Sequence, residues 1–273
     1  FRKLLPMLVG VALFTWAVGY VETSFLHLSR QSLVSNLPVM HSLMGFAISM
    51  LLVFRTNTAY DRWWEARKLW GQLVNTSRNV AIKLAAILPR EDGRARARYA
   101  IVLSRFAREL QLHLRSEKTR LALDALPHPE LEGLDPDKHV PAQIAALLHA
   151  RIHRAYRDGQ ITGDQLIGLT TDLTAFMDIC GACERIKNTP IPYSYSSFLK
   201  KFIVIYSLTL PFGFVFSLGY LAIPVVVFIF YVLASLELIA EEIEEPFGTD
   251  SNDLPLDRLT SMIAANCTEL LQA

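Results

Sequence analysis

Charged residues are scarce in this chain, and three long stretches have none or almost none. Only 19% of the 273 residues are charged, below the roughly 25% of an average soluble domain. Residues 4–21 and 202–236 carry no charge, and residues 31–54 carry none except the histidine His41. The 27 basic and 26 acidic side chains nearly balance, so net charge gives no support for nucleic-acid binding. Three cysteines are too few for a disulfide framework.

The uncharged stretches are long enough to cross a membrane as helices. A bilayer core about 30 Å thick needs about 20 residues of helix, which Leu4–Val21 and Ser35–Phe54 supply. Residues 202–236 would form a single helix of about 50 Å, too long for one crossing. The candidate breaks are Pro211, Gly213, Gly219 and Pro224. We therefore predict two short spans there, Phe202–Ser217 and Tyr220–Leu236, and four spans in all.

Basic residues indicate which side of the membrane the loops occupy. Arg2 and Lys3 precede the first span, Arg55 follows the second, and Lys200 and Lys201 precede the third. Because basic flanks stay in the cytoplasm, we expect both termini to be cytoplasmic. An apolar segment after Arg2 and Lys3 is also typical of a signal peptide, but no small-residue cleavage site followed by soluble sequence appears. The predicted parts are spans one and two in 1–54, a cytoplasmic helical region in 55–200, spans three and four in 201–237, and a cytoplasmic segment in 238–273.

Helical periodicity continues between the second and third spans. Apolar residues recur at helical spacing over Tyr60–Leu88, and no proline or glycine lies between Gly45 and Gly71, so this helix should continue the second span. Further helices are predicted at Arg94–Arg115, Pro141–Asp158 and Asp164–Asn188, and the four prolines of Pro127–Pro141 predict a loop. No long run alternates apolar and polar residues like a strand. The sequence therefore predicts an all-α polytopic membrane protein.

Two short motifs are compatible with metal or redox chemistry. Cys180 and Cys183 form a Cys-x-x-Cys pair, but zinc favours four ligands and only Cys267 remains as a further cysteine. Packing of small residues on a helix is the simpler interpretation. His149 and His153 lie four residues apart without an accompanying acid, which favours a solvated helix face. No serine-histidine-aspartate order, P-loop or Gly-x-Gly-x-x-Gly is found, so no nucleophile supports an enzyme.

Acidic residues crowd the end of the fourth span. They are Glu237, Glu241, Glu242, Glu244 and Glu245, followed by Asp250, Asp253 and Asp257. Closely spaced carboxylates suit a hard cation, whereas acids at a helix C-terminus oppose the helix dipole and call for basic partners. Arg62 and Arg67 are candidate partners. The sequence leaves structural ion pairs and an ion-attracting surface as alternatives.

The second span carries two different faces. Its apolar stripe consists of Val39, Leu43, Phe46, Met50 and Phe54, at steps of three and four residues. Ser42, Gly45 and Ser49 form a narrow stripe of small residues suited to close helix packing. Both stripes can simply pack against neighbouring helices. Alternatively, several copies around an axis could each contribute this helix to a pore whose apolar constriction gates by dewetting.

Three motifs resemble the bacterial bestrophin family. They are FRTNTAYDRWWEARKLWGQ at Phe54–Gln72, GACERIKNTPIP at Gly181–Pro192, and Pro-Phe-Gly at Pro246–Gly248. The resemblance extends over nearly the whole chain. It implies a homopentameric ion channel in the lipid bilayer of the bacterial inner membrane, with a hydrophobic neck, a cytosolic vestibule and a narrower aperture.

The resemblance also assigns residues to the conduction path. Counting back from Arg55 in steps of four places Phe54, Met50 and Phe46 in the neck, and Val39 and Leu43 extend the stripe to the outer mouth. Ungapped alignment places Asp164 at the cytosolic aperture, with Ile161 and Ile167 nearby. The family's Ca²⁺ clasp corresponds to 249–253, where only Asp250 and Asp253 are acidic, so no cofactor is expected to be required.

Selectivity follows from the charges on the cytosolic side. Asp164 and the acidic cluster at 237–245 favour cations, because rings of carboxylates concentrate them. We therefore expect a channel for small monovalent ions that prefers cations. A chloride or other anion channel of the same architecture is the alternative, and a membrane-anchored helical scaffold is a second one.

Overall fold

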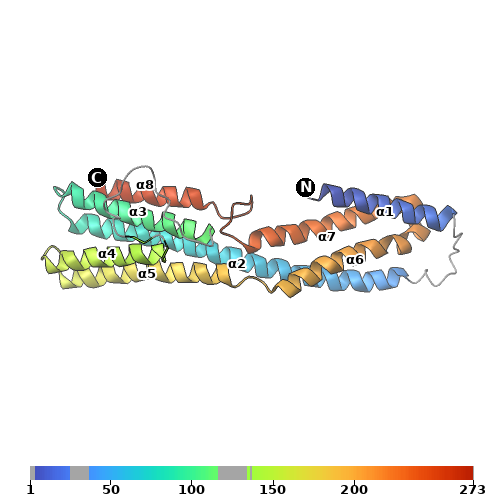
Figure 1. Ribbon diagram of the computed structural model, residues 1–273, viewed down its shortest axis with the longest axis horizontal. Coiled ribbons are helices and arrows are strands. Elements are labelled where there is room, and N and C mark those ends of the chain that lie inside the picture. Colours follow the sequence, from blue (N-terminus) through green and yellow to red (C-terminus); the bar gives the residue numbers. More distant parts are fainter. Residues whose placement is uncertain (1–3, 25–36, 116–133, 136, 273) are drawn as a thin grey trace. The chain divides into compact units, whose positions relative to one another are not determined.

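The computed structural model describes residues 4–24, 37–115, 134–135 and 137–272 (Figure 1). It contains helices and connecting turns and no strand within these ranges, which confirms the all-α prediction. Of the segment expected to form a proline-rich loop, residues 127–133 and 136 lie outside the described residues, and α4 begins within it at Val140. The connection at 25–36 lies entirely outside the described residues. Contacts divide the chain into two compact units, residues 1–62 with 190–244, and residues 63–189 with 245–273.

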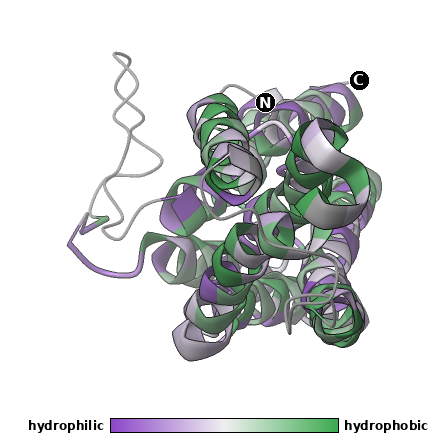
Figure 2. Ribbon diagram, turned by 90° about the vertical axis from the view of Figure 1, so that its right-hand side faces the viewer, coloured by the Kyte–Doolittle hydropathy of each residue, from purple (hydrophilic) through white to green (hydrophobic). Residues whose placement is uncertain are grey.

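The first unit contains the most apolar helices. These are α1 (Leu5–Ser24), the beginning of α2 (Leu37–Ile87), α6 (Tyr193–Leu218) and α7 (Ala222–Glu244). Ile48 and Leu52 of α2 share one apolar core with Ile203 and Tyr206 of α6 and Phe230 of α7. Hydrophobic residues, coloured green, predominate on many of the ribbons in Figure 2.

The turn between α6 and α7 lies at a glycine. Gly219 has a positive φ of 55°, a conformation that glycine adopts without steric cost, and it opens a short 3₁₀ turn over Gly219–Leu221. Pro211, a second candidate break, lies inside α6 and does not end it. The chain therefore breaks its long uncharged stretch at one of the expected positions and accommodates the proline within a helix.

Helix α2 is continuous over 51 residues, from Leu37 to Ile87. This confirms the prediction that the second span continues into the following helix, because no residue between Gly45 and Gly71 interrupts the backbone hydrogen bonds. The guanidinium of Arg96 marks its end, donating to the carbonyl oxygens of Ala85 at 2.7 Å and Leu88 at 2.8 Å. These are carbonyls that a helix end otherwise leaves without partners.

The second unit is a helical bundle with its own core. It contains the remainder of α2, α3 (Gly93–Arg115), α4 (Val140–Arg157), α5 (Gly163–Asn188) and α8 (Leu256–Gln272). The predicted helices at 94–115, 141–158 and 164–188 are confirmed to within a residue or two. Thr162 and Gln165 start α5 with a reciprocal capping box. Helix α8 packs against α3, as the red and green ribbons of Figure 1 show. It lies in the segment 238–273, for which the sequence had predicted no helix.

Five described helices are long and apolar enough to cross a membrane, and the sequence predicted four spans. The fifth is α5, whose buried residues, among them Leu169, Leu173 and Phe176, pack in the core of the second unit. Length and composition alone do not distinguish a buried helix of a bundle from a membrane helix. The count of four spans therefore stays a prediction.

Candidate functional site

The apolar stripe of α2 is exposed along its whole length. The exposed fractions are 64% for Val39, 69% for Leu43, 68% for Phe46, 45% for Met50 and 58% for Phe54. A contiguous apolar surface of this kind marks contact with lipid or with another chain. The five residues predicted to line the neck and its outer mouth are thus not buried by the rest of the described chain.

The opposite face of α2 is buried, which sets the orientation of the stripe. Ile48 is fully buried and Leu52 is 3% exposed. Gly45 packs closely against Tyr206 of α6. A Cβ atom at position 45 would lie only 2.8 Å from the tyrosine hydroxyl oxygen. The hydroxyls of Ser42 and Ser49 donate to carbonyl oxygens four residues earlier, Ser49 to Gly45 at 2.7 Å. The glycine of the small-residue stripe therefore serves close packing within the chain.

Arg55, the residue directly after Phe54, lies in a buried ion-pair cluster. Its Nη1 atom is 2.7 Å from Oε2 of Glu244, and its Nε atom is 3.6 Å from Oε2 of Glu237. The exposed fractions of the three side chains are 1% for arginine, 6% for Glu237 and 13% for Glu244. Two carboxylates and one guanidinium thus neutralise one another in part inside the first unit.

The sequence did not identify Arg55 as the partner of the acidic residues and suggested Arg62 or Arg67 instead. Arg62 approaches the same helix end, where its Nε donates to the backbone carbonyl of Glu244 at 3.1 Å. The sequence signal for this pairing was the position of Arg55 directly after an uncharged span. A cation buried at such a position needs an acidic partner.

Other acids of the cluster also have partners. Lys200 lies 2.8 Å from Glu241, and the backbone N–H of Ile191 donates to Oε1 of Glu244. In the second unit, Arg115 and Gln111 hold Asp257 at 2.9 Å and 2.7 Å. The hydrogen bond from Gln111, followed by that from Arg115, lowers the pKa of Asp257. Of the two alternatives for the acidic cluster, these contacts support structural ion pairs.

The two candidate Ca²⁺ ligands lie in one turn after the Pro-Phe-Gly motif. The backbone N–H of Asp250 donates to Oδ2 of Asp253 at 2.6 Å. The same oxygen lies beside Gly248, where a Cβ atom would approach it to 2.6 Å. One carboxylate oxygen of the pair is therefore engaged in holding the turn, and the expectation that no Ca²⁺ is required stays a prediction.

The three residues predicted at the aperture differ in exposure. Ile161 is 5% exposed and belongs to the core of the second unit, whereas Ile167 is 68% exposed. Asp164 is exposed in the first turn of α5, where a carboxylate also interacts favourably with the helix dipole. Asp164 and Ile167 are thus the accessible members of this group in the single chain.

All three cysteines are buried free thiols. Burial raises the pKa of Cys267 to about 12, and Cys180 and Cys183 are fully buried on α5. Because the thiolate is the reactive form, we expect a disulfide-exchange reagent to modify none of them in the folded protein and all three after denaturation. Thiol titration in mild detergent and in a denaturant measures both numbers. Rapid native modification of either Cys180 or Cys183 would contradict the packing interpretation.

Among the described residues, one group of three or more side chains could hold a metal ion, and it does not include His149 or His153, for which the sequence favoured a solvated helix face. It consists of His113, His139 and Glu184. No local sequence pattern marks this group, because His113 lies on α3, His139 caps the start of α4, and Glu184 lies on α5. Burial lowers the pKa of His113 despite its hydrogen bond to Glu184.

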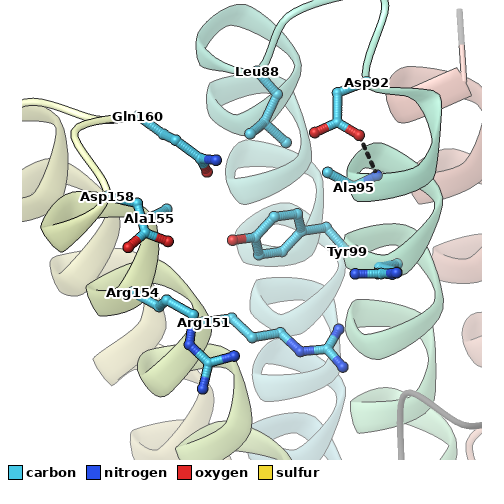
Figure 3. A pocket seen from close by; sticks show the side chains of 10 residues that line it. Leu88, Asp92, Ala95, Tyr99, Arg151, Arg154, Ala155, Asp158 and Gln160 are labelled. Atoms are coloured by element: carbon cyan, nitrogen blue, oxygen red, sulfur yellow. Dashed lines mark hydrogen bonds between the residues drawn. The ribbon is translucent and has the colours of Figure 1, made fainter.

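A cavity of about 510 Å³ opens elsewhere in the second unit (Figure 3). Its charged lining residues are Asp92, Arg98, Arg151, Arg154 and Asp158. The Asp92 carboxylate accepts a hydrogen bond from the N–H of Ala95 at 2.9 Å, at the start of α3. With both signs of charge around it, the cavity does not indicate one class of ligand.

Comparisons with known proteins cover nearly the whole chain. The family model described as bacterial/fungal bestrophin protein matches residues 1–269. A voltage-dependent anion channel-forming protein of Synechocystis is 35% identical over 87% of this chain and 79% of its own length. A protein with the same description from Ralstonia nicotianae is 36% identical over 84% of this chain and 76% of its own length. The solved structure of a mutated bacterial bestrophin homolog from Klebsiella pneumoniae is 28% identical, covers 99% of this chain and 100% of its own, and has a TM-score of 0.85.

Proposed function

The chain belongs to the bacterial and fungal bestrophin family, and from this premise we propose that it forms a homopentameric ion channel. The observation that carries the proposal is the exposed apolar stripe of Phe46, Met50 and Phe54 on α2. Relatives described as channel-forming proteins support conduction. The family and these relatives are channels rather than enzymes, in agreement with the absence of a nucleophile motif in the sequence.

In this proposal the second helices of five copies surround a neck. Apolar side chains at a constriction hold water weakly, so ions cross only when the passage is wide enough to stay hydrated. Phe46, Met50 and Phe54 form the constriction, and Val39 and Leu43 line its outer mouth. The permeating species are small monovalent ions. The channel lies in the bacterial inner membrane, with both chain termini on the cytoplasmic side.

For the sign of the permeating ion, Asp164 is the residue that favours cations. The acids at 237–245 give less support than their number suggests, because Glu237 and Glu244 pair with Arg55 and Glu241 pairs with Lys200. Anion conduction is the second candidate, and the descriptions of the relatives as anion channel-forming proteins favour it.

Reversal potentials across a salt gradient distinguish the two. In a planar bilayer with asymmetric KCl, we expect the reversal potential of the wild-type channel to be shifted from zero toward the equilibrium potential of K⁺. Removing the charge in Asp164→Asn should move the reversal potential toward zero, because a ring of five carboxylates is replaced by neutral amides. The matched control is Glu269→Gln, which removes an exposed carboxylate from α8.

Three outcomes count against parts of the proposal. A wild-type reversal potential shifted toward the equilibrium potential of Cl⁻ would replace the cation proposal by the anion alternative. An unchanged reversal potential in Asp164→Asn would remove Asp164 from the aperture. Absence of ion flux from the wild type and from the neck variants Phe46→Ala and Met50→Ala would favour the scaffold alternative.

A further inference from the structure

Three side chains that could ligate a metal converge from three helices of the second unit. His113 lies near the end of α3, His139 directly precedes α4, and Glu184 lies near the end of α5. The Nε2 atoms of the two histidines are 2.5 Å and 2.6 Å from the same carboxylate oxygen, Oε1 of Glu184. The centroids of the two imidazole rings are 4.7 Å apart.

The position of the group allows a solute to reach it. Side-chain exposures are 21% for His113, 36% for His139 and 26% for Glu184, so the group is partly covered and still open to water. All three ligand atoms lie within 4.8 Å of one another. The three ligand atoms are therefore already close together without a metal ion, because the packing of the helices holds them there.

We propose that His113, His139 and Glu184 form a binding site for one divalent transition-metal ion of the zinc type. Two imidazole nitrogens and one carboxylate oxygen are a ligand set that zinc accepts, with water in the fourth position. Imidazole ligands disfavour Ca²⁺ and Mg²⁺, which prefer oxygen. The metal-site proposal does not rest on the proposed channel function.

The distances require only a small opening of the group. Zinc–nitrogen bonds of about 2.0–2.1 Å in a tetrahedron place neighbouring ligand atoms about 3.3 Å apart. The two observed nitrogen–oxygen distances of 2.5 Å and 2.6 Å are shorter than this by less than 1 Å. A change of this size is within the reach of side-chain rotation at Glu184.

Metal binding also changes the proton positions on His139. Its Nδ1 atom now accepts the backbone N–H of Ala142 at 3.0 Å and caps α4, so the ring proton is on Nε2 and is donated to Glu184. An ion bound at Nε2 takes the place of that proton, and the neutral imidazole then carries its proton on Nδ1. The neutral ligand with Nδ1 protonated loses the capping hydrogen bond, so binding is coupled to the first turn of α4.

The test uses the untagged 273-residue chain in detergent after removal of metal with a chelator. Titration with Zn²⁺ alone should give one bound ion per chain. Glu184→Gln, which keeps an oxygen acceptor, and His139→Asn, which keeps a capping side chain, should each weaken binding at least tenfold. The control is the double variant His149→Ala/His153→Ala on α4, which should bind as the wild type does.

A second measurement reports the coordination itself. Co²⁺ in place of Zn²⁺ should give visible absorption of a four- or five-coordinate nitrogen and oxygen site in the wild type and in the control. Both site variants should lose it, while their melting curves in the presence of chelator show that they are folded. Absence of stoichiometric Zn²⁺ binding in the wild type, unchanged binding in both site variants, or loss of binding in the control would overturn the proposal.

Discussion

Widening the neck of the channel by Phe46→Ala or Met50→Ala is expected to increase ion flux roughly tenfold, equivalent to a barrier lower by about 1.4 kcal/mol. Each substitution removes a bulky apolar side chain that is exposed on α2, with exposed fractions of 68% and 45%. Five copies of the change widen an apolar constriction and allow water to remain in it. Ion flux from proteoliposomes, at equal protein content, measures the effect.

The matched controls replace residues of the same type elsewhere in the first unit. Phe228 on α7 is 65% exposed and Met7 on α1 is 48% exposed. Phe228→Ala and Met7→Ala remove comparable apolar surface and should leave the flux within about twofold of the wild type, because a side chain in lipid sets no constriction. Equal increases in controls and neck variants would show that the effect arises from loosening of the protein, and unchanged flux in Phe46→Ala and Met50→Ala would remove both residues from the neck.

Removing the buried guanidinium in Arg55→Ala should lower the free energy of unfolding by about 3–5 kcal/mol, the cost of breaking a buried ion pair from one side. The Arg55 side chain is 1% exposed and lies against the carboxylates of Glu237 and Glu244. Its loss leaves the Glu237 carboxylate buried without its ion-pair partner. Denaturant or thermal unfolding of the purified protein in detergent measures the change.

An exposed ion pair of the same chemistry supplies the control. Arg185 lies 2.7 Å from Glu65, with side-chain exposures of 65% and 44%. Solvent screens such a pair, so Arg185→Ala should change stability by at most about 1 kcal/mol. A wild-type unfolding transition in Arg55→Ala would contradict the assigned role of the cluster. Partial recovery in Arg55→Lys is expected, since lysine restores the charge without the planar fork of donors.

Features set by neighbouring residues were predictable from the sequence. The uncharged runs predicted the apolar helices, and the absence of glycine and proline between Gly45 and Gly71 predicted that α2 is continuous. Periodicity placed α3, α4 and α5 to within a residue or two, and the motif at Phe54–Gln72 identified the family. The steps of three and four residues along α2 put the apolar stripe on one face, because the helical repeat is local.

Features that join distant parts of the chain came only from the tertiary structure. Arg55 meets Glu237 and Glu244 through the packing of α2 and α7 in the first unit, and no local pattern links positions so far apart. The same holds for His113, His139 and Glu184, which lie at the ends of three helices. The sequence alone determined the helical segments other than α8, and it determined which faces are apolar, since both depend on residues within a few turns. Which charged and metal-binding side chains meet was decided by packing, because each meeting depends on the order in which the helices stack.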